Sequence, residues 1–414
     1  MKILLFHLTG NANVKSAAYG LISAGLLAEF HVSIASIPGG ILDRIGTFGP
    51  FSEIRRRRFD PVSKPFLRTW PWFEIGRIFA LKGGFTTLTH RKAGIFYIDA
   101  VVQNLDRHVA KRLKRAKKNE ISAVYGYEDT TLFAFREAKQ RGFQCLYDLP
   151  IGYWRAAYKI LEAERERWPE WMATMPGLEA SAEKLSRKEE ELQLADRIFV
   201  ASTFTASTLE YFPGKLAKIE VIPYGFPPVS KEIRIYAGFE SHRPLKLLFV
   251  GSLSQRKGIA YLFEAVKSFG DRVALTLVGS KITNDCPVLN KELSQHCWIP
   301  SLPHEQILNL MRESDVLVFP SLFEGFGLVI TEAMSQGTPV ITTNRTAGPD
   351  IIEHGKNGWL IEAGSTEALK ECISNILLSP ELIKQVGEAA MEKARLRPWA
   401  SYGKELAAAV GRNN

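Results

Sequence analysis

The chain has 414 residues, of which 46% are hydrophobic and 23% are charged, and its formal net charge is +9 at pH 7. This length is sufficient for two domains with full hydrophobic cores, and the composition is that of a globular protein rather than a disordered one. The apolar runs are strand-sized, which excludes a membrane-spanning helix, and the first of them, Ile3 to Phe6, is too short for a signal peptide.

The four cysteines give no sign of a metal site or of a disulfide framework. They are scattered along the chain, and the adjacent residues His296 and Cys297 are the one pair of neighbouring metal-ligand types. We therefore predict that the protein binds no metal and that it resides in the reducing cytoplasm. The cysteines are Cys145, Cys286, Cys297 and Cys372.

The amino-terminal half alternates short apolar runs with helical periodicity, and we expect a first domain over residues 1–225. A charged helical region is expected over 155–193 with a break at 175–177, and an inserted excursion with local helix over 50–92. The other predicted strands are 3–6, 31–36, 123–125, 144–147 and 197–201, with an extended segment at 221–222, and the other predicted helices are 17–29, 100–117 and 130–140.

Most of the positive charge is concentrated in residues 54–118, which hold seventeen Lys and Arg against four Asp and Glu. The window begins with Arg55–Arg58, continues with an aromatic run that includes Trp70 and Trp72, and ends in a basic segment at 107–118. Interleaved basic and aromatic residues are typical of a surface that binds an anionic membrane, while nucleic acid is a less favoured partner. The alternative for 107–118 is an ordinary surface helix whose basic residues face water.

The carboxyl-terminal half reads as a second βα series over residues 245–395, after a linker rich in Pro, Gly and polar residues at 226–244. Strands alternating with helices predict a parallel sheet with both faces covered, so the fold class is α/β. The predicted strands are 246–250, 274–278, 316–319 and 339–342, and the predicted helices are 258–268, 304–312 and 328–336.

Two glutamates, Glu324 and Glu332, lie eight positions apart around a Gly-Phe-Gly turn between a predicted strand and a predicted helix. The free N–H groups at the helix start favour a phosphate, and Gly325 and Gly327 leave room for a ligand to approach the backbone. A carboxylate on each side can accept hydrogen bonds from sugar hydroxyls, which indicates a nucleotide-sugar site. The alternative is a buried turn with a capping glutamate.

The sequence around this turn, PSLFEGFGLVITEAMSQGTPVI, resembles the family-4 retaining glycosyltransferases (glycosyl transferases group 1), whose E-x7-E signature Glu324 and Glu332 match. Further segments resemble the same family: Ala195 to Thr203, Val221 to Phe226, Val250 to Gly258 and Ala347 to Ile361. The resemblance implies the GT-B fold, in which two Rossmann-like domains face a cleft. It also implies that residues 396–414 form a helix that crosses back to the first domain.

The resemblance further implies roles for individual residues of the second domain. Arg256 and Lys257 would clamp the donor diphosphate without a metal or other cofactor, although this chain has Ser252 where many relatives have an Arg. Glu324 would contact the transferred sugar and Glu332 the ribose, while the backbone of Gly325, Phe326 and Gly327 would face the diphosphate or the sugar. The reaction would be a same-face displacement that retains the anomeric configuration.

In the first domain the family resemblance is weaker. Gly10 lies in the loop after the first strand, near where the family places glycines by the donor phosphate. Tyr147 and Asp148 stand where the family has His and Asp, so that Asp148 is a candidate for orienting the acceptor, or a turn cap. Glu128 and Asp129 are further acceptor-side candidates.

The preferred interpretation is therefore a transferase that moves a sugar from a nucleotide-sugar donor to a saccharide or lipid-linked acceptor, in cell-envelope or exopolysaccharide synthesis. If the basic stretch binds lipid, the protein would attach peripherally to the inner face of the plasma membrane. The alternatives are an inactive or basic surface-binding relative and a nucleotide-sugar epimerase or hydrolase. A nicotinamide enzyme is disfavoured because no G-x-G-x-x-G follows a predicted strand.

Overall fold

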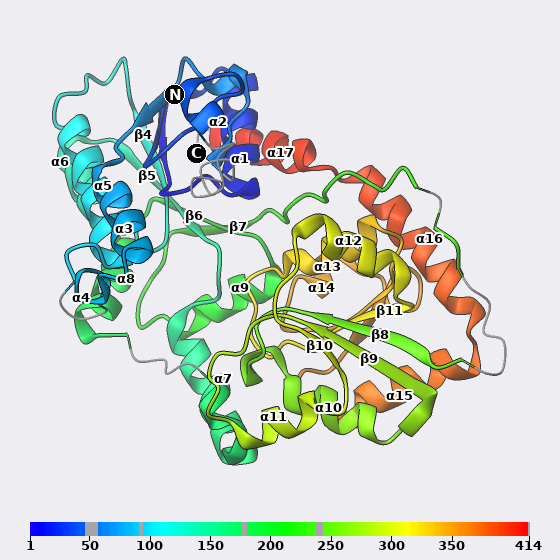
Figure 1. Cartoon of the computed structure of the whole chain (residues 1–414). Coiled ribbons are helices and arrows are strands. Elements are labelled where there is room, and N and C mark those ends of the chain that lie inside the picture. The colour runs from blue at the N-terminus through cyan, green and yellow to red at the C-terminus, as the bar shows by residue number, and fades with distance from the viewer. Residues whose placement is uncertain (46–56, 91–93, 176–179, 233, 237–242, 413–414) are drawn as a thin grey trace.

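The computed structural model describes residues 1–45, 57–90, 94–175, 180–232, 234–236 and 243–412. Their strands form two parallel sheets, and helices cover both faces of each sheet (Figure 1). This is the α/β class that the alternation of strands and helices predicts. We call the parts of the molecule built around these sheets the first and the second domain.

The first sheet has the strand order β3-β2-β1-β4-β5-β6-β7 in the described residues. Neighbouring strands are parallel: Ile3 lies opposite Leu27 on one side and opposite Ala123 on the other. The strands are β1 (Ile3–Phe6), β2 (Leu27–Val32), β3 (Leu67–Thr69), β4 (Ala123–Tyr127), β5 (Gln144–Leu149), β6 (Arg197–Val200) and β7 (Lys218–Val221).

Successive residues of β1 face opposite sides of this sheet, and each side is apolar. Ile3 and Leu5 pack in the cluster of buried residues that includes α1 and α17, whereas Leu4 and Phe6 pack against α5 and α6. The helices of this half of the chain are α1 (Ala12–Ser23), α2 (Ile41–Ile45), α3 (Trp72–Lys82), α4 (Thr86–Thr89), α5 (Ile98–Leu113), α6 (Leu132–Arg141), α7 (Trp154–Arg167), α8 (Ala182–Leu194) and α9 (Thr203–Thr208), with 3-10 turns η2 (Pro61–Ser63), η3 (Pro169–Thr174) and η4 (Leu209–Tyr211).

The second sheet has the order β10-β9-β8-β11-β12-β13 and is also parallel in the described residues. Its strands are β8 (Leu245–Val250), β9 (Val273–Val278), β10 (Cys297–Ile299), β11 (Val316–Phe319), β12 (Val340–Thr343) and β13 (Trp359–Ile361). The helical elements that follow along the chain are η5 (Gln255–Lys257), α10 (Ile259–Lys267), η6 (Gly270–Arg272), α11 (Pro287–Leu293), α12 (His304–Glu313), α13 (Leu328–Ser335), α14 (Gly348–Ile351), α15 (Thr366–Leu378), α16 (Glu381–Leu396) and α17 (Trp399–Gly411).

The last helix, α17, returns to the first domain and packs along α1 (Figure 1). The two helices approach so closely that a Cβ on Gly20 would lie 1.9 Å from the carbonyl oxygen of Gly403. The Ser16 hydroxyl also donates to the carbonyl oxygen of Trp399 at 2.5 Å. A helix after residue 398 that crosses back is therefore present.

A second connection between the domains runs through α7 and η3, which begin at the first sheet and end against the second (Figure 1). At the start of α7, the N–H of Tyr153 donates to the Thr208 hydroxyl of the first domain at 2.8 Å. Further along, Trp171 is buried in the core of the second sheet and stacks on Phe263 at 5.7 Å between ring centroids. The sequence predicts this helix but not the domain against which it packs.

The helix predicted at 17–29 and the strand predicted at 31–36 are both displaced in the structure. Helix α1 ends at Ser23, and Gly25, with φ of 66°, turns the chain into β2 at Leu27. Glu29 then lies in the strand, where Arg112 of α5 donates to its carboxylate at 2.6 Å. Because this partner is distant in the sequence, local periodicity gave the wrong assignment. The edge strand β3 was not predicted.

Candidate active site

The loop between β11 and α13 forms the centre of the candidate site, at the carboxyl end of a strand, where ligands bind in open α/β sheets. Residues 320–327 form this loop, which ends at Gly327 with φ of 87°, a conformation that favours glycine. We call it the glutamate loop, because it carries Glu324. Its strand and helix begin and end within one residue of the predicted 316–319 and 328–336.

Arg256 and Lys257 meet Glu324 directly. The Lys257 ammonium forms an ion pair with Oε2 of Glu324, and Arg256 Nη1 lies 3.3 Å from the same oxygen and donates to the carbonyl oxygen of Phe323 at 2.7 Å. Burial lowers the pKa of Lys257, and the Glu324 carboxylate opposes this shift. Two cations and one carboxylate, all largely shielded from solvent, thus lie in contact.

The glycine that follows the cations lets the two loops of the pocket approach. Gly258 has φ of 74°, and a Cβ there would lie 2.0 Å from the carbonyl oxygen of Pro320. Ser252 is half-buried earlier in the same loop, where the N–H of Leu253 donates to the carbonyl oxygen of Ser280 at 3.0 Å. This bond holds the loop after β8 beside the loop after β9.

Gln255, which sequence reasoning missed, anchors the two cations from behind. Its side chain donates to Glu164 of α7 at 3.0 Å, and its backbone N–H donates to the Thr174 hydroxyl of η3 at 3.0 Å. Glu164 also accepts from the Tyr261 hydroxyl of α10 at 2.8 Å. The α7–η3 segment therefore holds the loop that carries Arg256 and Lys257. The sequence indicates Gln255 only by its position next to the two basic residues. It gives no indication that Glu164 supports the site.

Glu332 lies on α13, half-buried, and Nδ1 of His304 is 4.0 Å from its Oε1. Burial raises the pKa of Glu332, and His304 at the start of α12 opposes the shift. His304 was not predicted, because a single histidine before a helix carries no motif.

The glutamate loop also contacts the first domain through its backbone. The Gly325 carbonyl oxygen accepts from the hydroxyls of Ser202 at 2.6 Å and Thr205 at 3.0 Å. The Phe326 side chain is buried, and its ring lies 4.8 Å from that of Tyr224. Phe326 is therefore part of the interface between the domains, while the prediction that the backbone N–H groups of residues 325–327 face a ligand stays a prediction.

In the first domain, Gly10 lies in the loop after β1 with φ of 66°, and its N–H donates to Nδ1 of His7 at 3.0 Å. The N–H of Thr9 donates to the same nitrogen at 3.1 Å. Burial lowers the pKa of His7 to about 4, which is consistent with a neutral ring that accepts both bonds. His7, not predicted from the sequence, thus organises this loop, and the Gly10 N–H is already bonded.

Asp148 is the second-last residue of β5 and is 2% exposed. Its carboxylate accepts a hydrogen bond from the Tyr125 hydroxyl at 2.6 Å. Burial raises the pKa of Asp148 to about 7, and the bond from Tyr125 opposes the shift. The carboxylate is thus buried beside Tyr125, so a role in orienting an acceptor remains a prediction that this burial does not favour.

Glu128 and Asp129 follow β4 and face three cations of α8. Lys188 lies 3.1 Å from Glu128, and Arg187 lies 3.1 Å from Asp129. Asp129 has φ of 69°, a left-handed conformation that is uncommon outside glycine and clusters at functional loops. Lys184 lies 3.4 Å from Asp129 and so links the group to the first turn of the helix.

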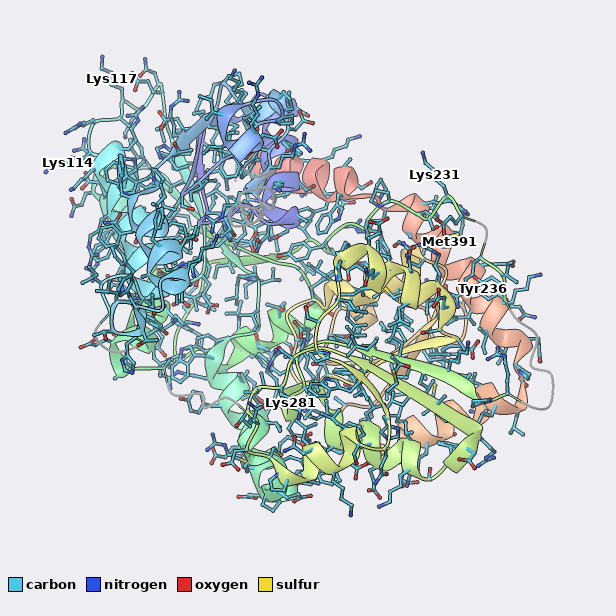
Figure 2. All side chains as sticks on the ribbon, in the orientation of Figure 1. Lys114, Lys117, Lys231, Tyr236, Lys281 and Met391 are labelled. Atoms are coloured by element: carbon cyan, nitrogen blue, oxygen red, sulfur yellow. The ribbon has the colours of Figure 1, made fainter. Side chains whose placement is uncertain are left out.

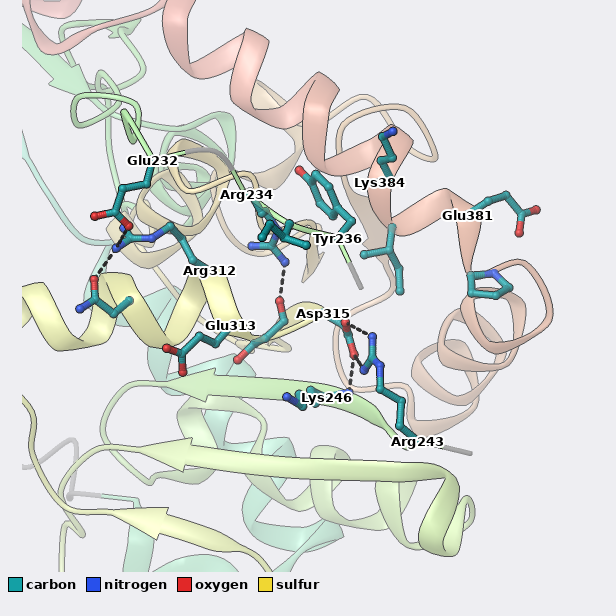
Figure 3. Close-up of a pocket in the computed structure, with 15 residues that line it drawn as sticks. Glu232, Arg234, Tyr236, Arg243, Lys246, Arg312, Glu313, Asp315, Glu381 and Lys384 are labelled. Carbon is teal, nitrogen blue, oxygen red and sulfur yellow. Dashed lines mark hydrogen bonds and ion pairs between the residues drawn. The ribbon is translucent and has the colours of Figure 1, made fainter. Parts of the chain in front are cut away.

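A cavity of about 800 Å³ lies at the opposite edge of the second sheet, near the amino ends of β8 and β11 (Figure 3). Several of the charged residues that line it are paired: Arg243 contacts Asp315 at 2.7 Å, and Arg312 contacts Glu232 at 2.9 Å. Arg234 donates to the carbonyl oxygen of Met311 at 3.1 Å. These contacts fix the linker to the second sheet, so we assign the cavity a structural role.

No group of three or more His, Cys, Asp and Glu in the described ranges is arranged to hold a metal ion. No helix in that part of the chain combines the length and the apolar composition that crossing a bilayer requires.

Comparison with known proteins matches the segment of the chain that carries the glutamate loop. Residues 232–393 match the family described as glycosyl transferases group 1. Over this segment the chain is similar to the group 1 glycosyl transferases. The matched segment includes Arg256, Lys257, Glu324 and Glu332.

Relatives of the matched segment occur in sugar-phosphate and polysaccharide synthesis. The chain is 27% identical over 185 residues to the alpha-maltose-1-phosphate synthase of Mycolicibacterium smegmatis, which covers 40% of this chain and 47% of the relative. It is 28% identical over 165 residues to the amylovoran biosynthesis glycosyltransferase AmsK of Erwinia amylovora, which covers 37% of this chain and 40% of the relative. The chain thus spans under half the length of these two relatives.

The whole fold matches solved structures as well. Anabaena Alr3699/HepE in complex with UDP and glucose has a TM-score of 0.60 and 16% identity, and the match covers 99% of each chain. The matched segment therefore lies in one of the two Rossmann-like domains of a GT-B fold, and the expected fold is confirmed.

Proposed function

We propose that the protein is a glycosyltransferase that moves a sugar from a nucleotide-sugar donor to a saccharide or lipid-linked acceptor. The observation that carries the proposal is the convergence of Arg256 and Lys257 on Glu324 at the carboxyl ends of β8 and β11. This combination of two cations and a carboxylate is suited to a ligand that carries both phosphate and hydroxyl groups.

The roles follow from the chemistry of each group. Arg256 and Lys257 would hold the diphosphate and stabilise the negative charge that it gains as the glycosidic bond breaks. Glu324 would accept hydrogen bonds from the transferred sugar and balance the two cations while the site is empty. Glu332 would accept from the ribose hydroxyls. Because these two cationic side chains would neutralise the charge of the leaving group, the proposed reaction needs no metal.

We further propose that the anomeric configuration is retained through a same-face displacement, in which the leaving phosphate takes the acceptor's proton. Glu324 is then a binding group and not a nucleophile, since its carboxylate is already engaged by Lys257. The names of the relatives support a role in the synthesis of sugar phosphates or polysaccharides. The solved complex of Anabaena HepE with UDP and glucose supports a nucleotide-sugar donor.

The test is nucleotide release from a panel of UDP-, GDP- and ADP-sugars by the native protein and by Glu324→Gln. We expect release from one class of donor, a loss of about a hundredfold in the variant, and no effect of EDTA. Glu388→Gln, on the exposed face of α16, is the matched control and should retain native activity.

Other outcomes would favour the alternatives. The absence of release from every donor, together with no thermal stabilisation by any nucleotide, would indicate an inactive or surface-binding relative. Conversion of the donor sugar to its epimer without release would indicate an epimerase. Equal rates of nucleotide release for the native protein and Glu324→Gln would show that Glu324 has no role in the reaction.

A further inference from the structure

Helices α3 and α4 and the residues beside them expose several large apolar side chains. Trp72, Phe79 and Phe85 are 65%, 62% and 61% exposed, and Leu81 and Ile95 are also more than half exposed. Trp72, Ile75 and Phe79 are spaced three and four residues apart, which places them along one side of α3. We call the surface formed by Trp72, Ile75, Phe79, Phe85 and Ile95 the α3–α4 face. Leu81 is exposed on another side of α3, because it lies two residues from Phe79.

Other aromatic residues of the same segment pack against the first domain. The exposed aromatic residues are therefore not explained by a segment that lacks packing contacts. Trp70 stacks on His108 of α5 at 4.2 Å between ring centroids, and its Nε1 donates to Asn104 at 2.7 Å. Phe73 meets Phe96 edge to face at 5.8 Å. These contacts fix α3 on the first domain and leave its other side uncovered by the described residues.

The segment of the chain that carries the α3–α4 face, residues 61–98, exposes basic side chains and no carboxylate in its described part. Glu74 is the one acidic residue between positions 61 and 98, and it is fully buried, where Arg57 and Arg77 pair with it. The basic residues Arg68 and Lys82 of the same segment are exposed. An exposed apolar segment whose own exposed charges are positive complements an anionic partner.

The face lies near the acceptor-side end of the first domain. Helix α5 starts directly after it, and Asp99 in the first turn of α5 lies 2.9 Å from Lys184 of α8, which in turn contacts Asp129. In Figure 1, α3, α4 and α8 appear at the same end of the first domain. The basic segment at the end of α5 is elsewhere, since Lys114 and Lys117 project from the opposite end of this domain (Figure 2). The stretch 54–118 is therefore not one surface.

We propose that the α3–α4 face docks on an anionic lipid bilayer. Trp and Phe side chains favour the interface between lipid headgroups and acyl chains, and each cation near anionic lipid strengthens binding. A second copy of the chain fits less well, because a symmetric contact would bring Arg68 and Lys82 against the same cations of its partner. Docking would present a lipid-linked acceptor to the cleft, and this last step rests on the proposed transferase function.

The test is co-sedimentation with vesicles of phosphatidylcholine alone and of phosphatidylcholine with phosphatidylglycerol, without nucleotide or acceptor. We expect binding to the anionic vesicles and release near 0.5 M salt. Phe79→Ala should weaken binding about tenfold, and Lys82→Glu should weaken it by at least about fivefold. The matched controls are Leu396→Ala on the exposed end of α16 and Lys117→Glu at the far end of the first domain, which should bind like the native protein.

Three outcomes would overturn the proposal: no binding to anionic vesicles, equal binding to neutral vesicles, or equal losses in the control variants. Light scattering that showed a dimer disrupted by Phe79→Glu would assign the face to a second copy instead. Donor hydrolysis in solution separates the two proposals, since it should be the same in the native protein and Phe79→Ala. Vesicle binding without any donor hydrolysis would support the docking and contradict the transferase.

Discussion

Tyr147 and Asp148 are neighbours in β5, yet their side chains lie on opposite faces of the first sheet. The Tyr147 hydroxyl lies 3.4 Å from Glu191 of α8, in the buried cluster on the α5–α6 side. Asp148 instead meets Tyr125. Strand alternation explains the separation, but the sequence around a strand end does not show how deeply the last carboxylate is buried. The sequence thus identified Asp148 as notable without indicating its environment.

This burial leads to a testable pH dependence of stability. A carboxyl group whose pKa rises from 3.8 to about 7 on folding binds its proton more tightly in the folded state, so its contribution to stability falls as the pH rises between these values. We expect Asp148→Asn, which has no charge to bury, to gain about 2–4 kcal/mol in unfolding free energy relative to the native protein between pH 4 and pH 8.

Urea denaturation of both proteins at pH 4, 6 and 8 measures this difference. Asp271→Asn, at an exposed position before β9, is the control and should show no comparable trend. A native-to-variant difference that stays constant with pH would mean that Asp148 titrates normally in the folded protein.

At the scale of elements, the glutamate loop was predictable because its signals are local. An apolar run bounded by a turn indicates β11, and glycines on either side of α13 mark its limits. The placement of α7 was not predictable for the opposite reason. A charged amphipathic helix indicates that one side is buried, but the sequence does not identify the surface that buries it. The anchoring of Gln255 by Glu164 therefore appears only in the structure.

This anchoring predicts that a residue remote from the glutamate loop controls donor binding. Glu164→Ala removes the acceptor for Gln255 and Tyr261, which leaves two buried polar side chains without this partner. We expect donor kcat/KM to fall about ten- to a hundredfold, mainly through KM, because Arg256 and Lys257 lose the support that positions them.

Steady-state donor hydrolysis and a thermal melt should be measured on the same preparations. Glu164→Gln keeps one hydrogen-bond acceptor and should recover part of the lost affinity, and Glu166→Ala on the exposed side of α7 should match the native protein. A fall in melting temperature without any change in KM would assign Glu164 a purely structural role.

At the scale of the whole molecule, the two sheets are not separate cores. One cluster of buried residues contains Ile3 and Leu5 of the first sheet together with Leu248 and Leu317 of the second. Tyr224 contributes to the join, with ring centroids 4.8 Å from Phe326 of the glutamate loop and 5.1 Å from Tyr402 of α17. The proposed donor site and the contact between the domains therefore share the glutamate loop.

The shared core predicts that the protein unfolds as one unit. We expect a single calorimetric transition for the native chain, because separating the domains would expose apolar surface of both. Trp171→Ala should lower that transition as a whole, with a loss of about 3–5 kcal/mol in unfolding free energy, since Trp171 fills the second core from a segment attached to the first sheet. Two resolved transitions, of which one is unaffected by the variant, would contradict this prediction.

The path of α7 and η3 also constrains how such proteins can be recombined. The obvious way to exchange the donor specificity is to replace the second domain at the linker. Here that exchange would leave out Trp171, Glu164 and Thr174, which lie before the linker in the sequence but support the second domain. A working hybrid has to carry residues 154–175 together with residues 245–396 from the same parent. The residues that form and support the proposed donor site are thus encoded by two separate stretches of the gene.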